Sequence, residues 1–310
     1  MSNGSGWTAD QIPDLTGLRA VVTGANSGLG LQTALQLARH GAYTTLACRS
    51  EERGQAAVDQ VRAQLGDGPG TADLALLDLA DLSSVRRFAE SWHGPLDILV
   101  NNAGVMAVPY DTTADGFERQ LGTNHLGHFA LTGLLLPALR QASAARVVNV
   151  SSLGHRMGRI DFDDLQSTRR YQRWLAYGQS KLANLLFTRE LVRRLNRAGS
   201  TVAAAAAHPG GSDTELYTGF AGASGPFARF AKAASQVTGQ PASAGALPSL
   251  YAATMPDVVP GDYFGPSSLS EVRGTPVRVG MSSRARDAAT GVRLWDVSES
   301  LTGVAYALPA

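Results

Sequence analysis

The segment Thr23-Gly24-Ala25-Asn26-Ser27-Gly28-Leu29-Gly30 decides which fold we predict for this chain. An apolar run at residues 19–23 reads as a buried strand, and the apolar residues of 31–38 recur at the spacing of one helical face. Glycines between a strand and a helix let the backbone approach a pyrophosphate closely, and the N-terminus of the helix offers unpaired N–H groups. A simple tight turn is the alternative, but both neighbours favour a dinucleotide-binding loop.

Strands and helices alternate after this loop. Strands are predicted at about 43–48, 73–77, 96–101, 146–151 and 201–207, and helices at about 51–65, 82–92, 117–141 and 175–197. The alternation predicts βαβ units, and the near-continuous apolar strands predict a parallel sheet buried on both faces. We therefore expect an α/β fold with one doubly wound parallel sheet of about seven strands and helices on both faces. Ligands bind such a sheet beyond the carboxyl ends of its strands.

The C-terminal part of the chain completes a single domain, which we place at residues 1–310. Residues 211–247 are rich in Gly, Ala and Ser and follow directly on the sixth strand, so we expect a mobile lid with short helices over the substrate; a plain surface loop is the alternative. A last strand from about residue 261 and a helix at about 284–301 are predicted beyond it.

Composition and charge argue against several classes of function. The formal net charge is +1 and there is no polybasic run, so we expect no nucleic-acid partner. Cys48 is the only cysteine, so no intrachain disulfide can form. The longest apolar stretches fall short of the ~20 residues of a transmembrane helix, and residues 1–17 lack the pattern of a signal peptide. These features predict a cytoplasmic protein without a transmembrane segment.

The second predicted strand ends at Ala47-Cys48-Arg49-Ser50, the point that distinguishes the two nicotinamide dinucleotides. An acidic residue here binds the ribose 2′-hydroxyl of NAD, whereas an Arg suits the 2′-phosphate of NADP. Arg49 therefore predicts NADP (NADPH/NADP+) as the cofactor. A solvated Arg that merely begins the next helix is the alternative.

Tyr177-Gly178-Gln179-Ser180-Lys181 places a Tyr and a Lys four residues apart on one face of a predicted helix. A nearby ammonium favours the phenolate and lowers the pKa of a Tyr from its usual value of about 10. A Tyr tuned in this way can exchange a proton with an alcohol or carbonyl oxygen. By itself, the same spacing also arises by chance on exposed helices.

Polar residues near other strand ends strengthen the catalytic interpretation. Ser151-Ser152 closes the fifth strand, where a hydroxyl can bind a substrate oxygen. Asn101-Asn102-Ala103-Gly104 closes the fourth strand, where a simple turn is the alternative. Asn124 lies inside the predicted helix 117–141 although Asn is a poor helix former, so we expect a kink there. A buried side-chain hydrogen bond is the alternative for Asn124.

Together these segments resemble the Asn–Ser–Tyr–Lys tetrad and the T-G-x-x-x-G-x-G loop of the short-chain dehydrogenase/reductase (SDR) family of Rossmann-fold enzymes. The resemblance runs from about Gly17 to at least Thr214. It implies an NADP-dependent oxidoreductase that interconverts an alcohol and a carbonyl by hydride transfer. By position, it implies that Tyr177 is the acid/base, that Lys181 lowers the pKa of this Tyr and holds the nicotinamide ribose, that Ser152 positions the carbonyl oxygen, and that Asn124 holds a water in a proton relay.

The resemblance also implies which residues bind the cofactor. They comprise the phosphate loop, the following strand ends and two members of the tetrad: Gly24, Asn26, Ser27, Gly28, Leu29, Gly30, Arg49, Ser50, Asp78, Leu79, Asn101, Ala103, Gly104, Tyr177, Lys181, Pro209, Gly210 and Thr214. In the family, the Pro-Gly turn and the Thr contact the nicotinamide end. No metal is expected, because His125 and His128 lie three residues apart and nothing nearby supplies a convincing third ligand.

One departure narrows the resemblance. Ser152 and Tyr177 are 25 residues apart, about twice the spacing of many family members. The inserted stretch, 158–174, together with the residues around Asn124 and Lys181, resembles the retinol dehydrogenase / protochlorophyllide reductase branch. The insertion precedes the helix that many members use for dimer contact, so the expectation of a homo-oligomer stays open.

Apolar side chains suggest the class of substrate. The predicted lid carries Leu216, Tyr217, Phe220, Phe227 and Phe230, and the insertion adds Met157 and Trp174. We expect a bulky hydrophobic alcohol, ketone or aldehyde as the small-molecule partner. Two other functions stay open: a catalytically silent, cofactor-sensing binding protein, which typically lacks the Tyr or the Lys, and an extended-type sugar-nucleotide epimerase or dehydratase, which usually carries G-x-x-G-x-x-G.

Overall fold

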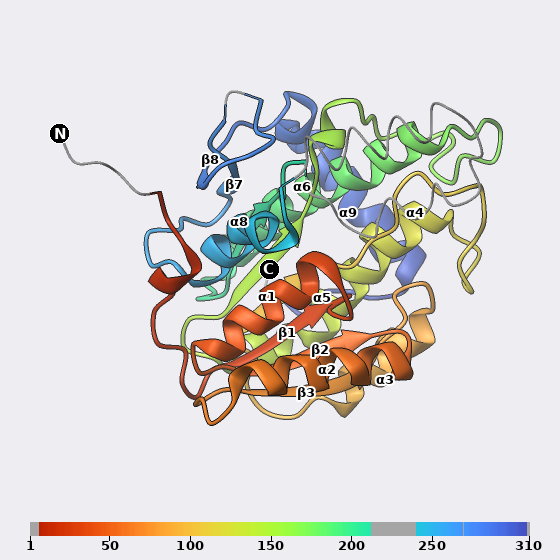
Figure 1. The fold of residues 1–310 in the computed structure, drawn as a ribbon. Helices are drawn as coiled ribbons and strands as arrows, with labels where there is room; N and C mark the ends of the chain where they lie inside the picture. The colour runs from red at the N-terminus through yellow and green to blue at the C-terminus, as the bar shows by residue number, and fades with distance from the viewer. Residues whose placement is uncertain (1–5, 212–239, 269, 309–310) are drawn as a thin grey trace, which may run out of the picture.

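The computed structural model describes residues 6–211, 240–268 and 270–308, which build one eight-stranded sheet (Figure 1). The strand order is β3-β2-β1-β4-β5-β6-β7-β8. The first seven strands are parallel, and β8 pairs antiparallel with β7 at one edge. The strands are β1 (Arg19–Thr23), β2 (Tyr43–Cys48), β3 (Thr71–Leu76), β4 (Ile98–Asn101), β5 (Arg146–Val150), β6 (Ala203–Ala207), β7 (Tyr263–Pro266) and β8 (Pro276–Arg278).

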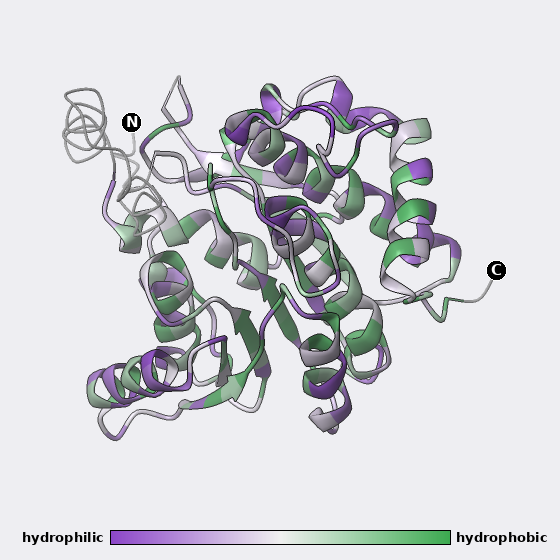
Figure 2. Cartoon of the chain, turned by 90° about the vertical axis from the view of Figure 1, so that its right-hand side faces the viewer, coloured by the Kyte–Doolittle hydropathy of each residue, from purple (hydrophilic) through white to green (hydrophobic). Residues whose placement is uncertain are grey.

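Helices cover both faces of this sheet, as predicted. One face carries α1 (Gly28–Arg39), α2 (Glu51–Leu65) and α8 (Ala242–Thr254); the other carries α3 (Leu82–Ser91), α5 (Gly127–Leu139), α6 (Arg173–Arg197) and α9 (Ala288–Thr302). Each face has its own apolar core, and the strands between them are coloured largely hydrophobic in Figure 2. A parallel sheet that is buried on both faces requires such strands.

The C-terminal half differs from the prediction in three places. The sheet has eight strands rather than about seven, because residues 276–278 add a short edge strand whose last two residues are exposed and give no apolar pattern. Residues 242–247, predicted as lid, instead begin α8, which packs beside α1. The predicted helix 284–301 is a 3₁₀ turn, η5 (Arg284–Arg286), followed by α9, which Asp287 caps at its N-terminus. The rest of the predicted lid, 212–239, lies outside the described residues.

The predicted helix 117–141 is not continuous. It consists of α4 (Arg119–Leu121), a π-helical turn, η2 (Gly122–Leu126), and α5. The expected irregularity at Asn124 is therefore confirmed, since this residue lies in the middle of the π turn. A π turn inside a helix marks a functional site in many proteins.

Two buried histidines stabilise this turn. His128 Nδ1 donates to the carbonyl oxygen of Asn124 at 3.0 Å, which leaves Nε2 to accept the hydroxyl proton of Thr23 at 2.9 Å. His125 Nε2 bonds Ser298 Oγ of α9 at 2.9 Å. Burial lowers the pKa of His128 to about 3 and that of His125 to about 4. Both rings are therefore neutral at physiological pH.

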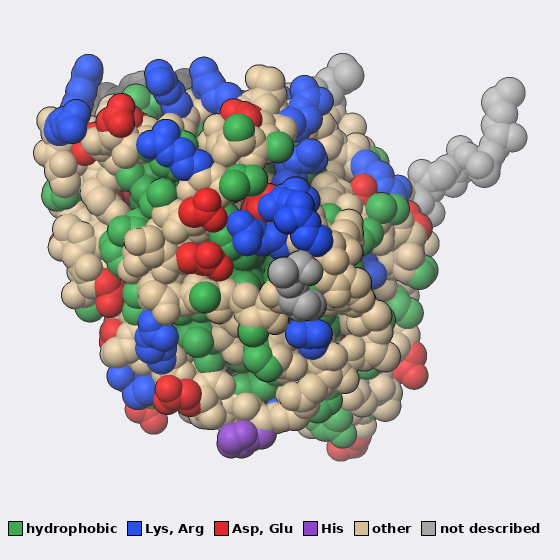
Figure 3. Space-filling model, turned by 180° about the vertical axis from the view of Figure 1, so that it is seen from behind, with side chains coloured by type: hydrophobic (Ala, Val, Ile, Leu, Met, Phe, Trp, Pro, Cys, Tyr) green, Lys and Arg blue, Asp and Glu red, His purple; other side chains and the backbone are tan. Residues whose placement is uncertain are grey.

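The surface carries both signs of charge. On the face seen in Figure 3, Lys and Arg side chains are interspersed with Asp, Glu and small apolar areas. No helix within the described ranges combines the length and the apolar character that crossing a membrane requires.

The buried histidines predict a specific loss of stability in mild acid. His125, His128 and His208 have folded pKa values of about 3 to 4, below their ordinary value of 6.5. Between these values the unfolded chain binds protons that the folded chain does not, so the free energy of unfolding falls as the pH drops. Each histidine contributes about 1.4 kcal/mol per pH unit below pH ~6.

Urea unfolding between pH 7 and pH 5 measures this slope. We expect His128→Gln to lower the free energy of unfolding at pH 7. We also expect it to reduce the pH dependence of that free energy by the contribution of one histidine, about 1.4 kcal/mol per pH unit. A slope equal to that of the wild type would show that His128 is not held neutral.

Candidate active site

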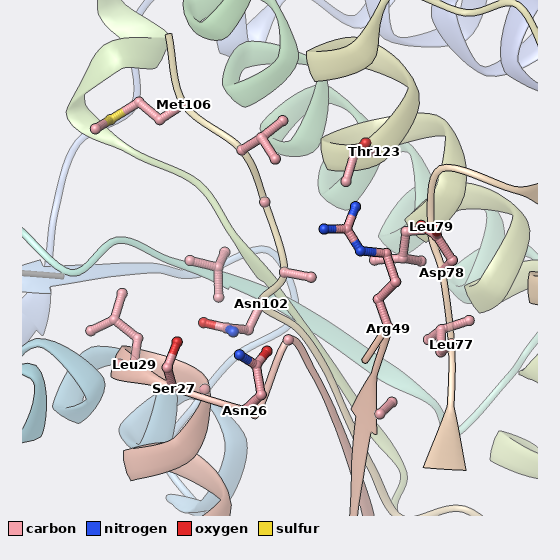
Figure 4. Close-up of a pocket in the computed structure, with 18 of the residues that line it drawn as sticks. Asn26, Ser27, Leu29, Arg49, Leu77, Asp78, Leu79, Asn102, Met106 and Thr123 are labelled. Atoms are coloured by element: carbon pink, nitrogen blue, oxygen red, sulfur yellow. The ribbon is translucent and has the colours of Figure 1, made fainter. Parts of the chain in front are cut away.

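One cavity of about 410 Å³ opens beyond the carboxyl ends of the strands (Figure 4). It lies where the strand order reverses between β1 and β4, so that the following chain segments diverge to opposite faces of the sheet. Its lining consists of Gly24, Asn26, Ser27, Gly28, Leu29, Gly30, Ala47, Arg49, Arg53, Leu77, Asp78, Leu79, Asn102, Ala103, Gly104, Val105, Met106, Val108, Thr123, Val150, Ser151, Tyr177, Lys181 and Pro209.

The N-terminus of α1 forms one wall and is left without a side-chain cap. Ser27 occupies the N-cap position but accepts no capping hydrogen bond, whereas α2, α3, α6 and α9 are capped by Ser50, Asp81, Gln172 and Asp287. The first-turn N–H groups of α1 therefore face the cavity uncapped. This arrangement suits an anionic group such as a pyrophosphate.

Close packing behind the loop requires a glycine at position 30. A methyl group there would lie 2.4 Å from the carbonyl oxygen of Gly24 and 2.5 Å from Nδ2 of Asn102. Asn102 Nδ2 itself donates to the carbonyl oxygen of Thr23 at 2.8 Å. The loop is thus tied to the end of β4, which forms the opposite side of the crevice.

Two arginines line the cavity at the ends of β2 and α2. Figure 4 shows Arg49 leaving the end of β2 and pointing into the cavity, with Asp78 beside it at the end of β3. Arg53 lies four residues after Arg49, in the first turn of α2, and also lines the cavity. Ser50 does not line the cavity; its hydroxyl caps α2 by accepting from Arg53 N at 3.3 Å. Cys48 is buried, and burial raises the pKa of its thiol to about 11, so the thiol stays protonated.

Tyr177 and Lys181 lie at the other end of the cavity, both on α6 and both buried. Lys181 Nζ donates to the carbonyl oxygen of Val150 at 3.1 Å and lies 5.8 Å from the centre of the Tyr177 ring. Burial lowers the pKa of Lys181 to about 8, which still leaves the ammonium charged at pH 7. The structure therefore places the Lys181 ammonium near the Tyr177 ring, both carried by α6.

The two serines after β5 have different environments. Ser151 Oγ donates to the carbonyl oxygen of Lys181 at 2.8 Å, which commits its hydroxyl proton to the backbone of α6. Ser152 Oγ accepts from Gly154 N at 3.1 Å, so its proton stays available to a ligand. A methyl group at Gly154 would approach Tyr177 Cε1 to 3.0 Å and Ser152 Oγ to 3.5 Å, so both side chains flank the same glycine. This geometry supports Ser152 rather than Ser151 as the partner of Tyr177.

Asn124 uses its carboxamide to join the loop after β4 to α6. Its Oδ1 accepts from Val105 N at 2.8 Å, and its Nδ2 donates to Val105 O and to Ser180 Oγ, each at 2.9 Å. The alternative of a buried hydrogen-bonded side chain is therefore realised. The water-holding role implied by the resemblance stays a prediction.

Several predicted site residues do not line the cavity. They are Ser50, Asn101, Asn124, Ser152 and Gly210. Asn101 lies inside the sheet, where it bonds Asn149 at 2.8 Å and Thr132 at 2.9 Å, because the last residue of β4 still points into the core. Gly210 directly follows Pro209, which does line the cavity. Thr214 lies outside the described residues.

The lining also contains residues that we did not predict. Arg53 could have been found from its place in the first turn of the predicted helix 51–65, directly after the strand end that carries Arg49. Asn102 lies between predicted residues. Met106, Val108 and Thr123 carry no local signal, because the path of the loop after β4 and the π turn bring them to the cavity.

Buried amide side chains hold the inserted stretch, 158–174, against the loop after β4 and against α6. Gln120 accepts from Ala107 N and donates to Tyr171 Oη, both at 2.8 Å, and Tyr171 Oη donates to Val108 O at 2.7 Å. Gln179, inside the Tyr–Lys motif, accepts from Asp161 N and donates to Leu165 O. The insertion therefore stabilises the wall formed by Met106 and Val108.

The described residues contain no group of three or more His, Cys, Asp or Glu side chains that could hold a metal ion. His125 and His128 bond separate partners, Ser298 and Thr23. A dinucleotide fits the cavity better than a metal does. Its pyrophosphate would meet the uncapped helix, its adenosine end would meet the arginines, and its reactive ring would reach Tyr177 and Lys181.

Comparisons with known proteins agree with this geometry. A family model described as short chain dehydrogenase matches residues 19–221. Retinol dehydrogenase 12 from Mus musculus is 44% identical over 304 residues, which cover 96% of this chain and 89% of that protein. The crystal structure of an uncharacterized protein from Mycobacterium Paratuberculosis is 47% identical, covers 98% of this chain and 100% of that chain, and gives a TM-score of 0.82. The Pseudomonas aeruginosa RhlG/NADP active-site complex is 26% identical, covers 81% and 94%, and gives a TM-score of 0.63.

Docking of the insertion predicts the effect of Tyr171→Phe. The substitution removes the donor to Val108 O and the acceptor for the buried amide of Gln120, so we expect a loss of about 1–3 kcal/mol in the free energy of unfolding. Amide hydrogen exchange should accelerate in residues 105–120 and 158–173 before it does in the sheet.

Tyr110→Phe is the matched control, because Tyr110 is 45% exposed and its ring packs edge-on against Tyr171. We expect a change below about 0.5 kcal/mol for it. Equal losses in the two variants would contradict the docking role of the Tyr171 hydroxyl.

Proposed function

The chain belongs to the short-chain dehydrogenase family, in its retinol dehydrogenase-like branch, and is therefore an oxidoreductase that interconverts alcohols and carbonyls; we propose that it depends on NADP(H), uses Tyr177 as acid/base and acts on a bulky hydrophobic substrate. One observation carries the proposal. A single cavity holds an uncapped helix N-terminus and two arginines at one end, and a Tyr beside a buried Lys at the other.

The preference for NADP rests on Arg49 and Arg53. Guanidinium groups bind phosphate through charge-assisted, bidentate hydrogen bonds, which a ribose hydroxyl cannot match. Cys48, which precedes Arg49, and Ser50, which follows it, carry no charge, so no carboxylate stands at the end of β2 to select the 2′-hydroxyl of NAD. The RhlG/NADP complex supports this choice as a related protein that binds NADP.

The proton chemistry rests on the residues at the other end. A bound NADPH supplies the hydride for reduction of the carbonyl carbon. The hydroxyls of Ser152 and Tyr177 bind the carbonyl oxygen, and Tyr177 gives that oxygen its proton as negative charge develops. The charged, buried Lys181 then stabilises the phenolate that remains, because a buried cation acts strongly over this short separation.

The class of substrate is inferred from the apolar side chains that line the cavity or lie close to Tyr177. Met106 and Val108 line the cavity, and the ring of Trp174 packs edge-on against Tyr177 at 6.4 Å. Met157 and Leu175 add exposed apolar surface, at 49% and 55% exposure. A substrate with a large apolar body would bury this surface, in line with the retinol in the name of the relative, retinol dehydrogenase 12.

Titration calorimetry with NADP+ and NAD+ tests the cofactor. We expect the wild type to bind NADP+ about ten- to a hundredfold more tightly, and Arg49→Ala or Arg53→Ala to remove most of that difference. Arg62→Ala is the matched control on the same helix, because Arg62 pairs with Asp73 at 2.7 Å away from the cavity. Equal affinities of the wild type for both nucleotides would refute the preference.

Tyr177→Phe tests the acid/base. The variant keeps the ring, so NADP+ affinity should change less than a few fold, while kcat/KM with NADPH and a hydrophobic aldehyde or ketone should fall by about 10²–10⁴. A variant that retains the kcat/KM of the wild type would place the proton donor elsewhere. Binding of NADP+ without turnover of any carbonyl by the wild type would instead favour the silent binding protein.

A further inference from the structure

A partly buried carboxylate outside the tetrad, 17% exposed, joins two segments of the active site. We propose that Glu271, on the loop between β7 and β8, is a positioning residue that fixes the turn His208-Pro209-Gly210, and through it the nicotinamide half of a bound NADP. This proposal rests on the proposed function, since it concerns the same cavity.

The turn depends on a histidine with a defined tautomer. The side chain of His208 is fully buried, and its Nδ1 accepts from Gly210 N at 3.2 Å. The proton of the neutral ring must therefore be on Nε2, which donates to Glu271 Oε2 at 3.1 Å. Burial lowers the pKa of His208 to about 3, with His155 and Arg156 adding to the shift, so the neutral tautomer holds throughout the physiological range.

The second oxygen of the same carboxylate reaches the turn that follows Ser152. Glu271 Oε1 accepts from Arg156 at 2.6 Å, and Arg156 ends the 3₁₀ turn η3 (Leu153–Arg156). The side chain of Arg156 is 51% exposed, so this ion pair adds little stability. Its effect is geometric: one carboxylate links the turn after β5 with the turn after β6.

The surrounding backbone is shaped around this link. Gly265 on β7 has no side chain, and a methyl group there would lie 2.0 Å from His208 Nε2. Gly211 N donates to Val272 O at 3.0 Å, which holds the β7–β8 loop against the turn. Glu271 itself has φ 53°, a left-handed conformation that is unfavourable for a residue with a side chain. Such strain is retained where the surrounding contacts favour it.

The position of Pro209 identifies which half of the cofactor is affected. Pro209 lines the cavity together with Tyr177 and Lys181, whereas Arg49 and Arg53 line the end at β2. A dinucleotide with its 2′-phosphate at the arginines can reach Pro209 only with its nicotinamide half. Displacement of the turn should therefore weaken contacts with that half and leave the adenosine half unchanged.

Glu271→Gln tests the link with two probes, NADP+ and 2′,5′-ADP. The amide keeps the size of the carboxylate but can accept from only one of the two donors. We expect the Kd of NADP+ to rise about tenfold and that of 2′,5′-ADP, which lacks the nicotinamide half, to stay within twofold. Unchanged binding of NADP+, or equal weakening of both ligands, would overturn the proposal.

Two further variants make the result specific. Asp257→Asn breaks a carboxylate–arginine pair with Arg278 of β8, away from the turn, and should leave both affinities unchanged. Arg156→Met breaks only the exposed ion pair between Arg156 and Glu271. It should raise the Kd of NADP+ about two- to threefold without changing that of 2′,5′-ADP, and it serves as the test if Glu271→Gln does not fold. Failure of the wild-type protein to bind either nucleotide would overturn the proposed function itself, whereas normal wild-type binding with unselective variants would overturn only the role of Glu271.

Discussion

The hydroxyl of Thr23 holds the crevice on which the active site depends. This hydroxyl accepts the N–H groups of Asn102 and Ala103, both at 2.9 Å, and donates to His128. It therefore joins the end of β1 to the end of β4, the two strands between which the order of the sheet reverses. The cofactor crevice exists only where the chain leaves these strands toward opposite faces, and Thr23 fixes how far the two ends separate.

Around Thr23, buried polar side chains of the site form hydrogen bonds with backbone atoms of neighbouring segments. His128 bonds the carbonyl oxygen of Asn124 in the π turn, and the side chain of Asn124 bonds the backbone of Val105 in the loop after β4. Lys181 bonds the carbonyl oxygen of Val150 at the end of β5. A buried polar group without a partner is costly, so each bond restricts its neighbours to one arrangement. The same restriction that stabilises the fold positions Tyr177 and Lys181 at the cavity and Ser152 next to Gly154, which Tyr177 also flanks.

Much of this site was predictable because its signals are local. A strand, a glycine loop and a helix predict a phosphate site by their order alone, and the spacing of Tyr177 and Lys181 is a property of one helix. Arg49 was identified by its place at a strand end, and Asn124 by its poor fit to a helix. The prediction was wrong where packing overrides local pattern: the start of α8 was taken for lid, and the three-residue β8 has too little pattern to be recognised.

By itself, the sequence determined the parallel sheet, the glycine loop after the first strand and the spacing of Tyr177 and Lys181 on one helix, because periodicity, glycine placement and helical spacing act over a few residues. Only the tertiary structure decided which serine keeps a free proton, how the insertion supports the wall at Met106 and Val108, and that Glu271 meets both His208 and Arg156. These relations join residues as many as 115 positions apart. Contacts of that kind arise from the crossing of chain segments, for which no local pattern of residues is required.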